Sequence, residues 1–283
     1  ISTGIADDLL TSTVLMYSKP IYICPAMHEE MFLNNQISSN LITLSKYHFI
    51  AGPRYGDLDI GDKGLGRLIE PNELNDCINK SKGKVIVTSG PTVEPIDDVK
   101  VISNKSSGKQ GRALAVELNS KGYEVIYIHS SLIQPIPGIK NKTFNTSEEL
   151  FVAISSEMKN TVSVFMTAAV SDFIVNKADG KISRHNGKLN IELTPNKDII
   201  ASIKSEYPEV EYIAFSAQVN DDLNFDKIKS KNVDYLVINN ILNNDFGSDV
   251  NKIAIINHEE LIYKSETLSK NEIAQAILIN LDY

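Results

Sequence analysis

A segment rich in glycine, serine and lysine follows an apolar run that is typical of a buried strand. It reads VTSGPTVEPIDDVKVISNKSSGKQG and spans residues 87–111. Ligands of parallel sheets bind where strands end, and helix N-termini there offer free N–H groups to anions. Gly90 permits close backbone approach, Ser106 and Ser107 can donate hydrogen bonds, and Gly108 opens a helix whose dipole favours negative charge. The segment suits a phosphate or a carboxylate, although SSGKQG is equally typical of a capped helix start.

Two other segments carry groups that folding alone does not require. TAAVSDF, residues 167–173, ends an apolar strand with small residues, so that a flat ring can lie against the backbone while Asp172 accepts a hydrogen bond. FDKIKSKN, residues 225–232, places Lys227 and Lys231 on one helix face, where both ammonium groups can reach one polyphosphate. A turn and an exposed lysine pair explain the same segments without any ligand.

Charge and composition limit the classes of partner. The 28 Lys and Arg residues against 36 Asp and Glu residues give a net charge of −8, which argues against a sequence-independent grip on nucleic acid. A bound anion must therefore be held by local basic groups, such as those of the loop 179–188, which is also typical of a solvated loop. No apolar run is long enough to cross a bilayer, and two cysteines make no disulfide framework, so we expect a cytoplasmic protein.

Strand-like apolar runs alternate with helix-like segments along the chain, a pattern typical of an α/β fold with a mainly parallel sheet and helices on both faces. Strands are predicted at residues 20–26, 84–89, 123–130, 162–170, 211–217, 234–240 and 252–257. Helices are predicted at residues 71–80, 108–122, 147–160 and 269–281. Polar and apolar residues alternate over 187–194, which predicts a strand outside the main sheet.

The polar segment NKSKGK, residues 79–84, divides the chain into a first domain over 1–82 and a second over 83–283. The first supplies too few strands for a complete doubly wound sheet, whose open edge would expose apolar surface. We therefore expect an incomplete first domain, and the absence of an initiating methionine agrees with a chain whose front part is missing.

Taken together, the segments resemble the bifunctional phosphopantothenoylcysteine decarboxylase/phosphopantothenate–cysteine ligase family of coenzyme A biosynthesis. The ligase pattern TAGGT-x-EPID-x-V-R-x-ISN-x-SSGK-x-G matches residues 88–111. Further on, AAVAD matches AAVSD, KIKK matches KISR, NPDI matches NKDI, and GFAAET matches AFSAQV, followed in the expected order by the lysine helix and FGSD. The resemblance covers essentially the whole chain and implies a Rossmann-like ligase domain preceded by a partial flavodoxin-like segment.

The resemblance also implies a reaction. Ligases of this family activate the carboxylate of 4′-phosphopantothenate with CTP as an acyl-cytidylate, and the amine of L-cysteine then displaces CMP. Mg²⁺, held mainly by the triphosphate, and lysines neutralise charge while pyrophosphate leaves. The family's ligase domains dimerise, so a homodimer that completes the substrate groove is expected, with neither nucleic acid nor membrane as partner.

Site residues follow from the matched motifs. Asn104 would orient the acyl group for attack by cysteine, and Lys181 would contact the phosphates and stabilise the activated intermediate. The residues expected around the nucleotide are Met166, Thr167, Ala168, Asp172, Lys181, Asn196, Lys197, Asp198, Ile199, Phe215, Lys227 and Lys231. The residues expected around the substrate and its phosphate are Gly90, Ser106, Ser107 and Gly108.

The first domain departs from the family pattern. PAMHEEMF, residues 25–32, resembles part of the FMN-dependent decarboxylase, but His28 replaces the asparagine that would hold the substrate. In LDIGDKGLGRLIEP, residues 58–71, Ile60 replaces the proton-donating cysteine, and an isoleucine cannot donate a proton. The front half, with the catalytic histidine and most of the flavin-phosphate contacts, is absent. We therefore predict neither decarboxylase activity nor bound FMN for this chain.

Two alternatives remain at this point. A nicotinamide-dependent Rossmann-type reductase shares the alternating pattern, but neither the G-x-G-x-x-G fingerprint nor a P-loop is present. A non-catalytic regulatory relative of the same family would explain the altered first domain. The retained asparagine, aspartate and lysines favour the ligase, because a pure scaffold has no need of them.

Overall fold

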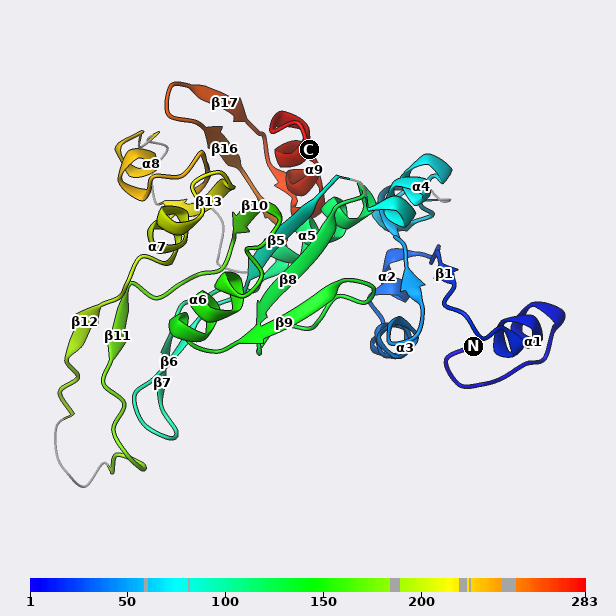
Figure 1. The fold of residues 1–283 in the computed structure, drawn as a ribbon, viewed down its shortest axis with the longest axis horizontal. Helices are drawn as coiled ribbons and strands as arrows, with labels where there is room; N and C mark the ends of the chain where they lie inside the picture. The colour runs from blue at the N-terminus through cyan, green and yellow to red at the C-terminus, as the bar shows by residue number, and fades with distance from the viewer. Residues whose placement is uncertain (59–60, 81, 184–188, 219–222, 224, 241–247) are drawn as a thin grey trace.

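The computed structural model describes residues 1–58, 61–80, 82–183, 189–218, 223, 225–240 and 248–283 (Figure 1). Within these residues an eight-stranded sheet has the order β17-β16-β14-β13-β10-β5-β8-β9. Its strands are β5 (Lys84–Ser89), β8 (Glu124–Ser130), β9 (Lys140–Phe144), β10 (Thr161–Met166), β13 (Glu211–Gln218), β14 (Tyr235–Asn240), β16 (Ile253–Ile256) and β17 (Leu261–Lys264). The six from β9 to β14 are parallel, whereas β16 and β17 pair antiparallel at one edge.

Helices cover both faces of this sheet (Figure 1). They are α5 (Lys109–Ser120), α6 (Ser147–Ser155), α7 (Ile199–Glu206), α8 (Phe225–Lys231) and α9 (Lys270–Asn280). Because side chains alternate along a strand, Ile86 of β5 packs into a core with α6, α7 and α8, while Val85 and Val87 pack into a second core with α5 and α9. The predicted α/β class, with a mainly parallel sheet between two helix layers, is confirmed.

The order of the strands reverses beside β5. The chain runs from β5 outward to β8 and β9, then returns to β10 on the other side and continues to β13 and β14. Such a reversal opens a crevice at the carboxyl ends of the strands, where ligands of this fold class bind. The topology thus fixes the edge of the sheet at which a site is expected.

Several predicted boundaries are corrected. Helix α6 ends at Ser155 instead of residue 160, and β9 and β17, which were not predicted, form the two edges of the sheet. Of the strand expected over 187–194, residues 187 and 188 lie outside the described residues, 189–192 are irregular, and β12 spans Leu193–Pro195. It pairs antiparallel with β11 (Phe173–Val175), away from the main sheet as predicted.

Two slender hairpins leave the body on the same side (Figure 1). One contains β11 and β12, and the other contains β6 (Val93–Pro95) and β7 (Val101–Ser103). Asp97, in the turn between β6 and β7, accepts from the Ile182 N–H at 2.9 Å and from Lys100 Nζ at 2.6 Å. The Lys100 hydrogen bond, opposed by burial but reinforced by backbone N–H donors, holds the pKa of Asp97 well below its usual range. This carboxylate therefore ties the two hairpins together.

The first 80 residues form small elements around a minor core of Ala51, Ile69 and Cys77. They are α1 (Leu9–Met16), β1 (Tyr22–Ile23), α2 (Glu29–Phe32), α3 (Asn35–Ser45), β2 (Phe49–Ile50), β3 (Arg54–Asp57), β4 (Lys63–Arg67) and α4 (Pro71–Asn79). Their strands form only two-stranded sheets within the described part of the chain, and Leu9 and Met16 are 85% and 87% exposed. Arg54 is paired with Glu73 at 2.8 Å and with Glu117 of α5, which fastens this segment to the larger sheet domain.

Candidate functional site

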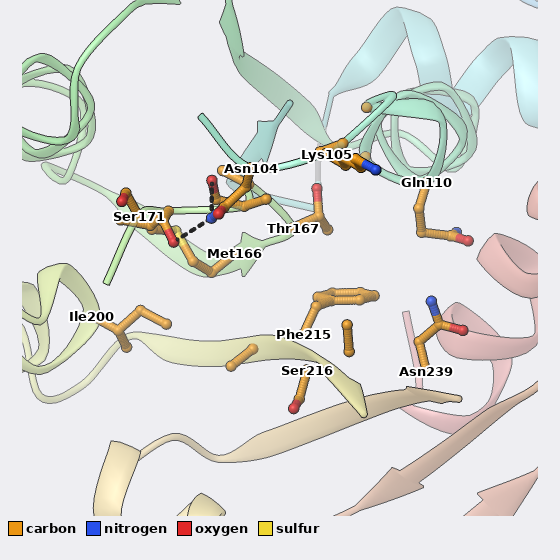
Figure 2. A pocket seen from close by; sticks show the side chains of 18 of the residues that line it. Asn104, Lys105, Gln110, Met166, Thr167, Ser171, Ile200, Phe215, Ser216 and Asn239 are labelled. Atoms are coloured by element: carbon orange, nitrogen blue, oxygen red, sulfur yellow. Dashed lines mark hydrogen bonds between the residues drawn. The ribbon is translucent and has the colours of Figure 1, made fainter. Parts of the chain in front are cut away.

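A cavity of about 790 Å³ lies where β10, β13 and β14 end (Figure 2). Its walls come from the segment before α5, the segment after β10, the start of α7, the end of β13 and one side of α8. Figure 2 shows Gln110 and Asn239 at one side and Ser171 and Ile200 at the other, with Phe215 between them. A volume of this size is in the range of small-molecule sites.

The segment before α5 forms one wall through its backbone. Gly108 has φ +68°, a conformation that favours glycine, and its carbonyl accepts from Ser89 Oγ at 2.8 Å. Helix α5 begins at Lys109, so its first N–H groups face the cavity together with Ser106 and Ser107. Ser106, Ser107 and Gly108, which were predicted to bind the substrate and its phosphate, all line the cavity.

Gly90 has a different place. It is not among the residues that line the cavity, and it has φ +86°. A Cβ atom there would lie 2.7 Å from Ile133 Cγ1 and 2.8 Å from Ser130 Cβ. Its carbonyl accepts from the Ala169 N–H at 2.9 Å. Gly90 thus shapes the backbone behind the site.

Asn104 is fixed to the segment after β10. Its Nδ2 donates to the carbonyls of Val170 at 2.9 Å and Ala169 at 3.3 Å (Figure 2). Because the amide nitrogen is committed to the backbone, the orientation of Oδ1 is set as well. Asn104 lines the cavity, where Oδ1 can accept a hydrogen bond from a ligand.

The wall expected around a nucleotide is held by hydrogen bonds from Asn196, which precedes α7, to the carbonyls of residues 171–172. The Asn196 N–H donates to the Asp172 carbonyl, and Asn196 Nδ2 donates to the Ser171 carbonyl, each at 2.8 Å. Asp198 caps α7 by accepting from the Ala201 N–H at 3.0 Å. Of the residues predicted to surround a nucleotide, nine from these segments line the cavity: Met166, Thr167, Ala168, Asp172, Asn196, Lys197, Asp198, Ile199 and Phe215.

Cationic groups from α8 face this wall. Lys227 Nζ donates to Ser216 Oγ at 2.7 Å, and Lys231 Nζ lies 3.9 Å from Asp198 Oδ2. Burial, reinforced by the like charge of Lys231 and opposed by Asp172, lowers the pKa of Lys227. Two partly buried lysines beside a nucleotide-sized cavity are suited to holding phosphates.

The floor of the cavity depends on Gly111, which lies in α5 directly over β5 and β10. A Cβ atom there would lie 2.4 Å from Thr167 Oγ1 and 2.7 Å from Ser89 Oγ. The absence of a side chain therefore lets α5 approach the strand ends and places its first turn in the site.

We expect Gly111→Ala to lower the free energy of unfolding by about 1–3 kcal/mol, because the added methyl group forces α5 away from the strands. Urea denaturation of the whole chain measures this change. Val152→Ala, at a 56% exposed position of α6, is the control and should stay within about 0.5 kcal/mol of the unsubstituted chain. Equal effects of the two substitutions would contradict the close-packed floor.

Comparisons with known proteins agree with these motifs. The model of the DNA/pantothenate metabolism flavoprotein C-terminal domain matches residues 81–282, and the Flavoprotein model matches residues 1–83. The coenzyme A biosynthesis bifunctional protein CoaBC of Vibrio cholerae is 32% identical over 294 residues, which cover 98% of this chain and 73% of that protein.

The chain belongs to the CoaBC family.

A second CoaBC protein and a relative with a different name are similar to this chain over almost its whole length. CoaBC of Bacillus subtilis is 32% identical over 297 residues, with 98% of this chain and 73% of that protein covered. A protein from an unknown prokaryotic organism named cysteine/cysteine sulfinic acid decarboxylase is 32% identical over 298 residues, with 98% of this chain and 83% of that protein covered. The resemblance recognised in the sequence is confirmed.

Solved structures share the fold. The C-terminal domain of CoaBC has a TM-score of 0.56 at 26% identity, covering 70% of this chain and 95% of that one. A DNA/pantothenate metabolism flavoprotein from Streptococcus pneumoniae has a TM-score of 0.61 at 22% identity, covering 71% of this chain and 98% of that one. The larger domain of this CoaBC-family chain therefore has the fold of its relatives.

Lys181 is separated from the other predicted site residues of the CoaBC-family cavity. It is exposed and does not line the cavity, and its neighbours Gly180 and Ile182 are bonded to Asp98 and Asp97 of the opposite hairpin. Arg184 and Lys188 of the same loop lie outside the described residues. A single chain thus brings together the other predicted nucleotide residues but not Lys181.

The decarboxylase-like positions lie in the first segment. His28 precedes α2 and forms no side-chain cap bond there, while Glu29 accepts from the Leu65 N–H at 2.9 Å and so joins α2 to β4. Ile60 lies outside the described residues. No helix in the described part of the chain has the length and apolar character needed to span a membrane.

Sequence reasoning missed a group at the far side of the cavity. Gln110, Asn239, Asn251 and Lys270 all line it, yet they come from four separate elements. The signal around Lys270 indicated only a helix start, since Ser269 and Glu272 form a capping box. Nothing in its spacing pointed to a ligand.

Proposed function

We propose that this chain is a phosphopantothenate–cysteine ligase, which uses CTP to couple 4′-phosphopantothenate to L-cysteine in coenzyme A biosynthesis. The observation that carries the proposal is the convergence of Asn104, Asp172, residues 196–199 and the Lys227/Lys231 pair on one cavity. These groups come from distant parts of the sequence, and family membership alone did not require them all to be retained.

In the proposed first step, a carboxylate oxygen of 4′-phosphopantothenate attacks the α-phosphorus of CTP, and pyrophosphate leaves. Lys227 and Lys231 stabilise the negative charge of the phosphates, since both line the cavity and Lys231 Nζ lies 3.9 Å from Asp198 Oδ2 of the nucleotide wall. Small residues 167–169 admit the pyrimidine ring, and Asp172 accepts a hydrogen bond from the nucleoside. Mg²⁺, when bound, lowers the charge of the triphosphate, and we propose that the triphosphate itself supplies most of its ligands.

In the proposed second step, the amine of L-cysteine attacks the acyl carbon, CMP leaves with the pair of electrons of the acyl–phosphate bond, and the ammonium proton passes to solvent. The family motif implies that Asn104 orients the acyl group. Because its Nδ2 already donates to two backbone carbonyls, we propose that its Oδ1 accepts from the incoming amine and so aligns the amine with the acyl group. No covalent enzyme intermediate is needed. The product is 4′-phosphopantothenoylcysteine.

The reaction can be tested directly. With CTP, Mg²⁺, 4′-phosphopantothenate and cysteine present, we expect one CMP and one pyrophosphate for each amide formed, and a lower rate with ATP. CTP binding without turnover would favour a regulatory family member. Hydride transfer from a nicotinamide cofactor without pyrophosphate release would favour a reductase, and either outcome would reject the ligase.

We propose that the active species is a cytoplasmic homodimer formed through the ligase domain. The two hairpins expose apolar side chains, with Val99 63%, Val101 51% and Phe173 46% exposed. Pairing of these surfaces would bury them and would bring a Lys181 toward a cavity that its own chain does not reach. Sedimentation analysis is the test, and a monomer with full ligase turnover would reject the dimer.

We further propose that the first segment lacks decarboxylase activity and does not retain FMN. Its described strands form only two-stranded sheets, and His28 stands where the family pattern has asparagine. Incubation with FMN and 4′-phosphopantothenoylcysteine is expected to release no CO₂, while a full-length bifunctional relative in parallel should release it. Measurable turnover by this chain would refute the prediction.

A further inference from the structure

The far side of the cavity is formed by the starts of two helices that pack side by side. Gln110 Nε2 in the first turn of α5 donates to the carbonyl of Lys270 in the first turn of α9 at 3.2 Å. Both helices are longer than ten residues, α5 with 12 and α9 with 11. Their positive dipole ends therefore lie beside the same part of the cavity.

The ammonium group of Lys270 lies in this corner and donates to the neutral amide of Asn251. With the Asn251 amide oriented to satisfy its neighbours, Asn251 Oδ1 accepts from Lys270 Nζ and from Asn239 Nδ2, the latter at 2.9 Å. Asn251 is only 7% exposed, and Asn239 also lines the cavity. This network fixes the position of Lys270 without neutralising its charge.

The other charges around Lys270 leave the corner cationic. Among the residues that the structure describes, the charged groups that face it are Lys109 from α5 and Asp249 from the segment before β15 (Val250–Asn251), and these two form an ion pair with each other. Over the described part of the chain these groups leave one positive charge in excess, which together with the two helix starts makes a site for a compact anion.

We propose that Lys270, positioned by Asn251 and Asn239, binds a phosphate group of a cavity ligand at the starts of α5 and α9. The phosphate comes either from the triphosphate of the nucleotide or from the phosphorylated acid, both of which belong to the proposed ligase reaction on which this inference rests. Both sources present anionic phosphate oxygens, and pairs of ligands with and without the phosphates distinguish the two.

Inorganic tripolyphosphate tests the site without relying on the ligase reaction. Calorimetric titration of the whole chain is expected to show binding that is about ten- to hundredfold weaker in Lys270→Gln, because one charge-assisted contact is lost. Lys270→Arg should stay close to the unsubstituted chain, as should Lys264→Gln, which removes an exposed charge on β17 outside the cavity. Equal affinity in Lys270→Gln and Lys264→Gln, or no binding by the unsubstituted chain, overturns the proposal.

A pH series gives a second readout. Burial, reinforced by the like charge of Lys109 and opposed by Asp249, lowers the pKa of Lys270 to about 8. An anion favours the protonated amine, so tripolyphosphate affinity should fall as pH rises through about 8 in the unsubstituted chain. Lys270→Arg keeps its charge and should show a smaller fall. Identical profiles would count against direct contact between Lys270 and the anion.

Two ligand pairs identify the source of the phosphate. If Lys270→Gln weakens the binding of CTP but not of CMP, the corner binds the triphosphate. A defect for 4′-phosphopantothenate but not pantothenate assigns it to the acid, and no selective defect in either pair overturns the inference. Lys270-dependent tripolyphosphate binding in a chain without ligase turnover would reject the proposed function while keeping the phosphate site.

Discussion

Asn104→Ala should leave acyl-cytidylate formation within about threefold of the unsubstituted rate and slow aminolysis by cysteine about 10²–10³-fold. The side chain is fixed by two carbonyls from the segment after β10, so its Oδ1 is placed before the amine arrives. Activation of the carboxylate requires charge neutralisation by lysines, whereas the attack of cysteine requires an oriented amine. The two steps should therefore separate.

Rapid-quench measurements resolve this prediction. Pyrophosphate release without cysteine reports the first step, and consumption of the preformed acyl-cytidylate after addition of cysteine reports the second. Asn75→Ala, at an exposed position of α4, is the matched control and should change neither rate. If Asn104→Ala slows both steps equally, the orienting role is wrong and Asn104 is needed to build the cavity itself.

Lys227→Met should lower kcat/KM for CTP about 10²–10³-fold, chiefly through the first step. Lys227 is partly buried, donates to Ser216 and lies close enough to Lys231 and Asp172 for both charges to affect its pKa. A partly buried ammonium group acts on a triphosphate through a lower local dielectric than a fully exposed one does. Removal of the Lys227 ammonium should therefore lower kcat/KM for CTP more than removal of a surface charge does.

Lys229 offers a control on the same helix. It is exposed and does not line the cavity, so Lys229→Met removes an equal charge two residues away and should alter kcat/KM for CTP less than about threefold. Thermal unfolding shows whether either variant has lost the fold. Similar losses for Lys227→Met and Lys229→Met would mean that α8 acts only through its net charge, which contradicts direct contact with phosphates.

Local features of the sequence determined much of this protein. Central parallel strands such as β5 and β13 are buried on both faces, so they are nearly continuous apolar runs that can be recognised without a structure. The spacing of Lys227 and Lys231 placed them on one side of a helix because four residues make about one turn. The segment around Asp172 was also recognisable from local sequence, because small residues follow directly after a buried strand. The ordered set of motifs also identified the family.

Other features were decided by the tertiary structure alone. The edge strands β9 (KNKTF) and β17 (LIYK) lack long apolar runs because an edge strand is only partly covered, so pattern alone did not reveal them. Lys181 belongs to one of the matched family motifs, yet the contacts between the two hairpins hold its neighbours Gly180 and Ile182 against the opposite hairpin, outside the cavity. The motif predicted a lysine at residue 181, but it did not determine where that lysine lies relative to the cavity.

The clearest case is the corner at Lys270. Gln110 and Lys270 are 160 residues apart, and they meet because the sheet turns back through antiparallel β16 and β17 before α9 packs beside α5. Spacing along a helix or strand is set by the local geometry of the backbone and can be read from neighbouring residues. The meeting of two helix starts depends on strand order and on which core face each helix buries, and that information exists only once the whole sheet has formed.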